Sequence, residues 1–117
     1  ISSLQGEFQK AISYLDSLLK LVPTDYEGYF LRGTAKGNMM NIKGSIADYD
    51  MAIKYNPNYM EAYTNRGFQK INALPVAEKI GNKSGCLEDP CADFKKAKAL
   101  GDTAADDMLF LYCKDCK

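Results

Sequence analysis

The feature that most constrains the fold of this sequence is a repeat with a period of 34 residues. Pro23 and Pro57 are separated by 34 positions, and so are Gly33 and Gly67. The stretch VPTDYEGYFLRG, which ends at Gly33, aligns with NPNYMEAYTNRG, which ends at Gly67. A fixed period of this length indicates a repeat architecture, in which each unit buries its apolar face against its neighbours.

The segments between these markers have the periodicity of amphipathic helices. Apolar residues recur at three- and four-residue steps in the segments that precede Pro23 and Pro57. Each proline marks a helix end, because it lacks the backbone donor and disfavours helix in the residue before it. Gly101 marks the end of a later helix. We expect helices at about 7–20, 26–38, 42–55, 60–73, 89–100 and 103–115, with a loop at 74–88.

This pattern resembles the tetratricopeptide repeat family, whose unit is a pair of antiparallel helices, A and B. In that family a small residue in helix A meets a small residue in helix B where the helices approach closely. A bulky apolar residue follows in helix B, and a proline ends that helix. The matching residues are Gly33 and Gly67 in helix A; Ala11, Ser45 and roughly Pro90 in helix B; Leu15, Tyr49 and Phe94 at the bulky position; and Pro23 and Pro57 at the end.

The resemblance implies an all-α fold, a right-handed superhelical stack of antiparallel helix pairs that forms a single domain. Counted back from Ala11, the chain starts inside helix A of the first repeat, so little of that helix is expected. The last helix is expected to cap the exposed end of the stack. The implied organisation is a partial repeat at 1–25, a second repeat at 26–59, a third at 60–102 with an insertion at 74–88, and a capping helix at 103–117, together spanning 1–117.

The resemblance also implies a function, namely a non-catalytic protein–protein interaction module that holds a peptide or a partner's helix in a concave groove lined by the A helices. The corresponding partner-binding residues are Glu27, Phe30, Leu31, Thr34, Asn38, Glu61, Thr64, Asn65, Phe68 and Asn72. Apolar anchors next to amides suit peptide recognition. The glutamates predict a mildly acidic groove that favours a basic or neutral partner segment.

Two alternatives remain open for this surface. Phe30 and Leu31 could instead pack against a neighbouring helix. The chain could also act as an assembly scaffold that self-associates through its truncated N-terminal repeat.

Composition narrows the function further. Lys+Arg and Asp+Glu are both 15, so no basic excess is left to neutralise phosphates, and nucleic acid is not expected as a main partner. The sequence contains no His, which removes the Ser-His-Asp and Cys-His arrangements. We therefore expect neither an enzyme nor a cofactor. The apolar runs fall far short of the roughly 20 residues that span a bilayer.

A repeated arginine, Arg32 and Arg66, could form an anion site. The repeat register instead predicts a structural role, because Asp48 and Asp93 occupy one equivalent position on the B helices. We expect Arg32–Asp48 and Arg66–Asp93 pairs that bridge each helix pair.

The four cysteines, Cys86, Cys91, Cys113 and Cys116, all fall in the C-terminal third of the chain. Their spacing allows unlinked thiols, one or two disulfides, or a structural zinc site with four thiolate ligands. Cys91 and Cys113 lie on helices that we expect to pack together. The sequence does not decide among these alternatives.

Overall fold

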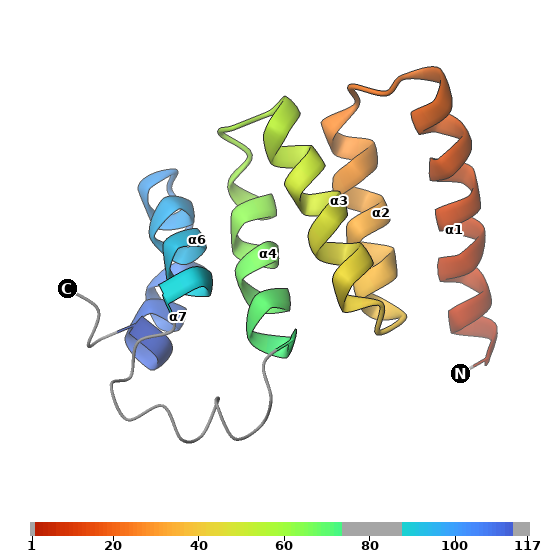
Figure 1. Cartoon of the computed structure of the whole chain (residues 1–117). Coiled ribbons are helices and arrows are strands. Elements are labelled where there is room, and N and C mark those ends of the chain that lie inside the picture. Colours follow the sequence, from red (N-terminus) through yellow and green to blue (C-terminus); the bar gives the residue numbers. More distant parts are fainter. Residues whose placement is uncertain (1, 74–87, 114–117) are drawn as a thin grey trace. The chain divides into compact units, whose positions relative to one another are not determined.

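The structure, a computed structural model, describes residues 2–73 and 88–113, and every regular element within them is an α-helix. These helices agree closely with the predicted ones, except at the start of the first. The loop expected at 74–88 lies outside the described residues apart from Glu88, where a helix begins. In chain order the helices are α1 (Ser2–Leu21), α2 (Tyr26–Asn38), α3 (Ile42–Tyr55), α4 (Met60–Ala73), α6 (Glu88–Ala99) and α7 (Ala104–Cys113) (Figure 1).

The first helix is longer than the repeat register predicts. We expected helix B of the first repeat to begin near residue 7, but α1 begins at Ser2. The early segment contains no proline, and a Cβ atom at Gly6 would meet nothing within 4 Å, so nothing in it stops the helix. Among the described residues the first repeat therefore consists of helix B alone.

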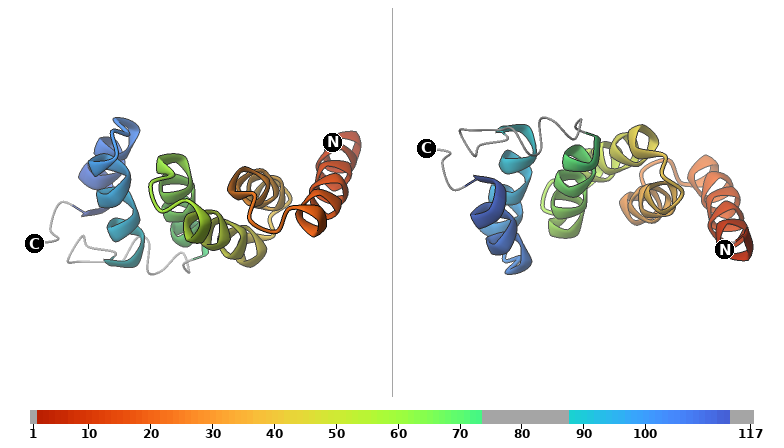
Figure 2. Two further views of the ribbon diagram at one scale, coloured as in Figure 1. Left: turned by 90° about the horizontal axis from the view of Figure 1, so that it is seen from above. Right: turned by 90° about the horizontal axis from the view of Figure 1, so that it is seen from below.

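The chain divides into two compact units, Ile1–Pro57 and Asn58–Lys117. The division follows the proline that ends the second repeat. In the first unit α2 packs against both α1 and α3, and in the second α6 packs against both α4 and α7 (Figure 2). Within each unit, helices that follow one another in the sequence are therefore neighbours in space, as expected for packed helical hairpins.

Each of the helix pairs α2–α3 and α4–α6 has a glycine at its point of closest approach. A Cβ atom at Gly33 would lie 3.0 Å from the ring of Tyr49 and 3.1 Å from the carbonyl oxygen of Ser45. A Cβ atom at Gly67 would lie 2.8 Å from the ring of Phe94. Any larger residue would push the paired helices apart, which explains why the glycine recurs with the repeat.

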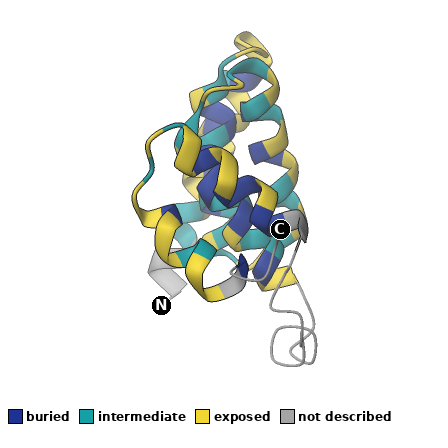
Figure 3. Ribbon diagram, turned by 90° about the vertical axis from the view of Figure 1, so that its left-hand side faces the viewer, coloured by how far each residue is buried: buried dark blue, intermediate teal, exposed yellow. Residues whose placement is uncertain are grey.

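The core lies where these paired helices meet. On α3, Ser45, Tyr49 and Ala52 are fully or almost fully buried, and on α6 the same holds for Phe94 and Ala97. Buried and exposed positions recur along the helices, as Figure 3 shows for those that face the viewer, which is the pattern of an amphipathic helix with one face in the core.

Side chains satisfy the free backbone groups at several helix ends. Asp25 caps α2 by accepting a hydrogen bond of 3.2 Å from the backbone nitrogen of Gly28, and Asn41 caps α3 in the same way. Gly101, two residues after the end of α6, has a φ of +107°, which glycine adopts without strain, so the chain can turn there toward α7. Asp102 then accepts a hydrogen bond of 2.9 Å from the nitrogen of Ala104, the first residue of α7.

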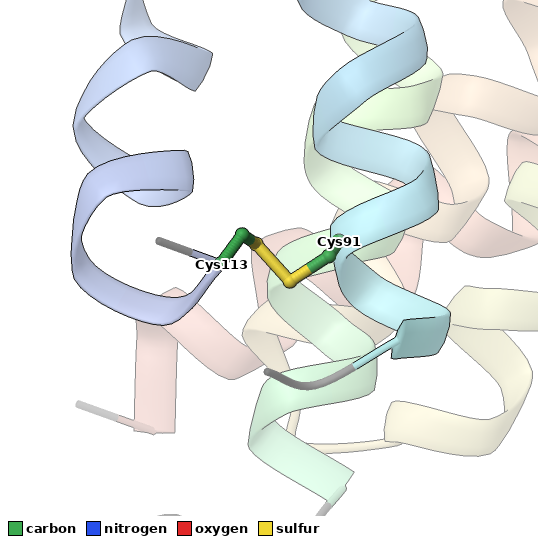
Figure 4. The surroundings of a disulfide bond; sticks show 2 residues. All are labelled: Cys91 and Cys113. Carbon is green, nitrogen blue, oxygen red and sulfur yellow. A yellow bond between two sulfur atoms is a disulfide. The ribbon is translucent and has the colours of Figure 1, made fainter. Parts of the chain in front are cut away.

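A disulfide between Cys91 and Cys113 joins α6 to α7, with a Cα–Cα distance of 5.8 Å (Figure 4). Both residues are buried. Both sulfur atoms are used in this bond, whereas a four-thiolate zinc site would require them as free thiolates. The other two cysteines, Cys86 and Cys116, lie outside the described residues. The described residues also contain no group of three or more His, Cys, Asp or Glu placed to hold a metal ion.

The disulfide predicts a measurable contribution to stability. Replacing Cys91 and Cys113 together by Ala should lower the free energy of unfolding by about 3 kcal/mol, because a covalent loop of this size restricts the unfolded chain. Urea unfolding of the full chain, followed by circular dichroism, measures this difference. As a control, dithiothreitol should destabilise the native sequence much more than the double variant. Equal unfolding midpoints for the native sequence and the variant would contradict the prediction.

Candidate partner-binding surface

The first unit carries an open apolar groove of about 370 Å³ between α1 and α2. Three of the predicted partner-binding residues line it, and none of its described lining residues is charged. The lining residues are Phe8, Ala11, Tyr14 and Leu15 from α1, and Leu31, Thr34, Ala35 and Asn38 from α2.

Helical periodicity places both walls of this groove. The α1 residues follow one another at three- and four-residue steps, or directly in the case of Leu15, so they share one face of the helix. Leu15 is buried, while Ala11 is exposed and Tyr14 is 69% exposed. On α2, Ala35 is buried and Leu31 is 53% exposed. The groove therefore has a buried floor and apolar side chains that remain accessible along its walls.

The remaining predicted residues of the first unit differ in their roles. Glu27 is exposed. Phe30 is partly buried, with its ring centroid 5.6 Å from that of Tyr49, and the hydroxyl of Thr34 shares a hydrogen bond of 3.0 Å with the hydroxyl of Tyr49. Packing against a neighbouring helix was the alternative expected for Phe30 and Leu31. Phe30 does contact α3, whereas Leu31 stays open to solvent.

In the second unit the predicted residues lie on α4. Glu61, Phe68 and Asn72 are exposed, and Asn65 is partly exposed. The ring of Phe68 also packs edge-on against Phe94, with centroids 5.5 Å apart.

Thr64, also on α4, has a structural contact. It is buried, and its hydroxyl donates a hydrogen bond to the carboxylate of Asp102, the residue that caps α7. Its role in this structure is therefore to fasten the start of α7 to α4.

The two arginines occupy the positions expected from the repeat register. The Nε and Nη2 atoms of Arg32 donate to Asp48 at 2.9 and 2.7 Å, and those of Arg66 donate to Asp93 at 3.0 and 2.6 Å. Both aspartates are 3% exposed. The hydrogen bond to Asp48 raises the pKa of Arg32 even above its usual high value. Each guanidinium directs two of its N–H donors at a buried carboxylate and so links helix A to helix B. This structural role argues against the anion site.

Each buried carboxylate also receives a lysine that was not among the predicted structural pairs. Lys36 lies 3.2 Å from Asp48, and Lys70 lies 3.1 Å from Asp93. The sequence spacing indicates these contacts, because each lysine follows its arginine by four residues and so lies on the same helix face. The face of α1 that forms the other wall of the groove was expected only as a surface for self-association, and not as part of the peptide-binding groove.

The geometry on each unit defines the class of fold: this chain has the tetratricopeptide repeat fold. Among solved structures it is similar to the TPR2B domain of yeast Sti1 in a complex with pHsp70, with a TM-score of 0.70 and 23% sequence identity. The match covers 94% of this chain and 83% of that chain. No protein-family model and no curated protein matches the sequence. Across the described residues, no helix combines the length and the apolar character that crossing a membrane requires.

The buried carboxylates predict a stability effect that is separate from binding. Asp48→Asn keeps the side-chain shape but removes the charge that meets Arg32 and Lys36, so it should cost about 3 kcal/mol in the free energy of unfolding. Urea unfolding of the full chain measures this cost. Asp107→Asn, at an exposed position on α7, is the matched control and should cost less than about 1 kcal/mol. Equal effects of the two substitutions would show that the Asp48 pair is not a structural clamp.

Proposed function

We propose that this chain is a non-catalytic protein–protein interaction module that binds a peptide or helix of a partner protein through its A helices, with α2 as the binding helix of the first unit and α4 as that of the second. The observation that carries the proposal is the open apolar groove along α2. Its lining includes Leu31, Thr34 and Asn38. An apolar surface that is concave and exposed is typical of sites where another protein or ligand binds.

The chemistry of these surfaces defines what a partner must supply. Leu31 and Phe68 are exposed apolar anchors, which can bury a partner's apolar side chain. Asn38, Asn65 and Asn72 each carry an amide that can both donate and accept, as recognition of a partner's backbone requires. Partner segments with apolar side chains next to accessible polar groups therefore fit best.

Charge adds a preference to this surface. Glu27 and Glu61 are both exposed, one near the start of each A helix. The predicted binding residues include no Lys or Arg, so nothing among them offsets these carboxylates. We infer that the partner segment is basic or neutral, because an acidic segment would meet like charge.

The likeness to the TPR2B domain supports a partner of this kind. That domain of yeast Sti1 is known from a complex with pHsp70, so the same fold can hold another protein. Transferring this use to the present chain is part of the proposal, because fold alone does not determine function.

The proposal is tested by selecting binders from a random peptide library displayed on phage. Selected peptides should bind the full chain in fluorescence anisotropy and should be basic or neutral on average. Leu31→Ala should weaken them by about tenfold, because it removes an apolar anchor. The matched control is Leu111→Ala on α7, where the leucine is 63% exposed but lies outside the groove, and it should change affinity less than about twofold. Failure to select any binder, a mainly acidic pool, or equal effects of the two substitutions would contradict the proposal.

A further inference from the structure

We propose that the Cys91–Cys113 disulfide is a redox-controlled anchor for the last helix, so that its reduction releases α7 from α6 while α4 and α6 stay paired. This inference goes beyond the proposed function, because it concerns how the fold responds to oxidising and reducing surroundings. It follows from the difference between the contacts that hold α7 and those that hold the other helices.

The first argument is the small number of side chains that α7 buries. Among the α7 residues whose side chains the structure describes, only Ala105 and Cys113 are buried. Phe110 and Leu111 are instead 71% and 63% exposed. By contrast, five residues of α4 are buried. A helix of ten residues is marginal in water unless it packs an apolar face, so burial of this extent does not hold α7 in place by itself.

The second argument is that the disulfide has no equivalent among the polar contacts described for α7. Near the start of the helix, the hydroxyl of Thr64 donates a hydrogen bond to Asp102, and Lys98 lies 3.0 Å from Asp106. Lys98 and Asp106 are both exposed, and exposed ion pairs contribute little to stability. At the end of the helix, the described contact is the covalent bond from Cys113 to α6. The C-terminal end of α7 therefore depends on this bond.

The third argument is that the pairing of α4 with α6 does not depend on the disulfide. A Cβ atom at Gly67 would lie 2.8 Å from the ring of Phe94, so the two helices approach closely on their own. Arg66 and Lys70 lie 2.6 and 3.1 Å from the buried carboxylate of Asp93. Breaking the sulfur–sulfur bond removes none of these contacts. Its loss should therefore act locally, on α7.

A dithiol reductant can break this anchor by thiol–disulfide exchange. One thiolate of the reductant attacks a sulfur of the Cys91–Cys113 bond, which breaks and leaves the other cysteine as a thiol. The second thiol of the reductant then displaces the remaining cysteine from the mixed disulfide. Two electrons and two protons pass to the protein, and the reductant becomes a disulfide. Oxidising surroundings keep the anchor, and sufficiently reducing ones remove it.

The release of α7 also affects α4 through Thr64. Asp102, which accepts the hydrogen bond of the Thr64 hydroxyl, caps α7 by accepting a second hydrogen bond from the nitrogen of Ala104. Thr64 follows Glu61 by three residues and precedes Phe68 by four, so it adjoins both on the surface of α4. When α7 is released, Asp102 is no longer held in place. The surroundings of the α4 face that is proposed to bind a partner therefore change with the redox state.

The test is amide hydrogen exchange, followed by nuclear magnetic resonance, on the full chain with Cys86→Ser and Cys116→Ser, so that one cysteine pair responds. Mass spectrometry after alkylation reports whether that pair is oxidised. Dithiothreitol should lower the protection of α7 amides such as those of Leu109 and Phe110 at least about tenfold. The amide of Phe94 on α6 should change less than about threefold, and reoxidation should restore α7.

Two further variants separate the anchor from other causes. With Cys91→Ala and Cys113→Ala added, α7 should exchange rapidly with or without dithiothreitol, which removes any effect of the reductant itself. Thr64→Val deletes the hydroxyl at nearly constant size. In the oxidised chain this variant should keep the protection of α7 within about threefold, because the disulfide still holds the end of the helix.

The α4 signals test whether the release reaches that helix. On reduction, the amide signals of Asn65 and Phe68 should shift, whereas those of Leu31 and Thr34 on α2 should stay where they are.

Several results would overturn the inference. These are a cysteine pair that does not oxidise, α7 protection that survives reduction, and an equal loss of protection in α4, α6 and α7. Release of α7 in the oxidised Thr64→Val chain would show that the hydroxyl, and not the disulfide, is the anchor. Unshifted α4 signals would show that the release does not reach α4.

Discussion

The close contact between helices A and B is the constraint on which the rest of this structure depends. Gly33 and Gly67 remove the side chain at the crossing, which brings the helix backbones close to Tyr49 and Phe94. At that distance a carboxylate on helix B becomes buried, and the arginine and lysine of helix A neutralise it. Close packing and charge pairing therefore belong together, because the buried carboxylate would be costly without its cations.

The same constraint determines which surfaces remain for binding. Where helix A is present, its glycine face is buried and its opposite face carries exposed groups such as Glu27 and Leu31. In the first unit, the face of α1 that carries Ala11, Tyr14 and Leu15 forms the second wall of the groove. At the other end of the chain, the Cys91–Cys113 disulfide and the bond from Thr64 to Asp102 hold α7 in place.

The sequence predicted the helices and the arginine–aspartate contacts well, because both follow from spacing along one chain. A 34-residue offset relates Arg66 to Arg32, but Asp93 follows Asp48 by 45 residues, so the second pair also required recognition of the 11-residue surplus in the third repeat. Spacing could not choose among the cysteine alternatives, because disulfide formation depends on the distance between helices and not on their sequence separation.

Three further features of the structure could not be predicted from the spacing of the repeat. The repeat register predicted a later start for α1, but the early residues contain no strong helix breaker, so the helix continues through Gly6. The role of Thr64 depends on where the chain turns near Asp102, which periodicity does not show. The α1 wall of the groove was predicted only as a surface for self-association, because it lies on a B helix, whereas the resemblance places the partner-binding residues on the A helices.

The central claim, that a partner segment binds in the groove lined by α1 and α2, is tested most directly by nuclear magnetic resonance with a nitroxide label at the centre of a peptide selected from the phage library. The label should broaden the amide signals of Ala11, Tyr14 and Thr34, which lie along the groove, and leave those of Phe110 and Leu111 on α7 sharp. Broadening centred on α7, or spread evenly over the chain, would contradict the account.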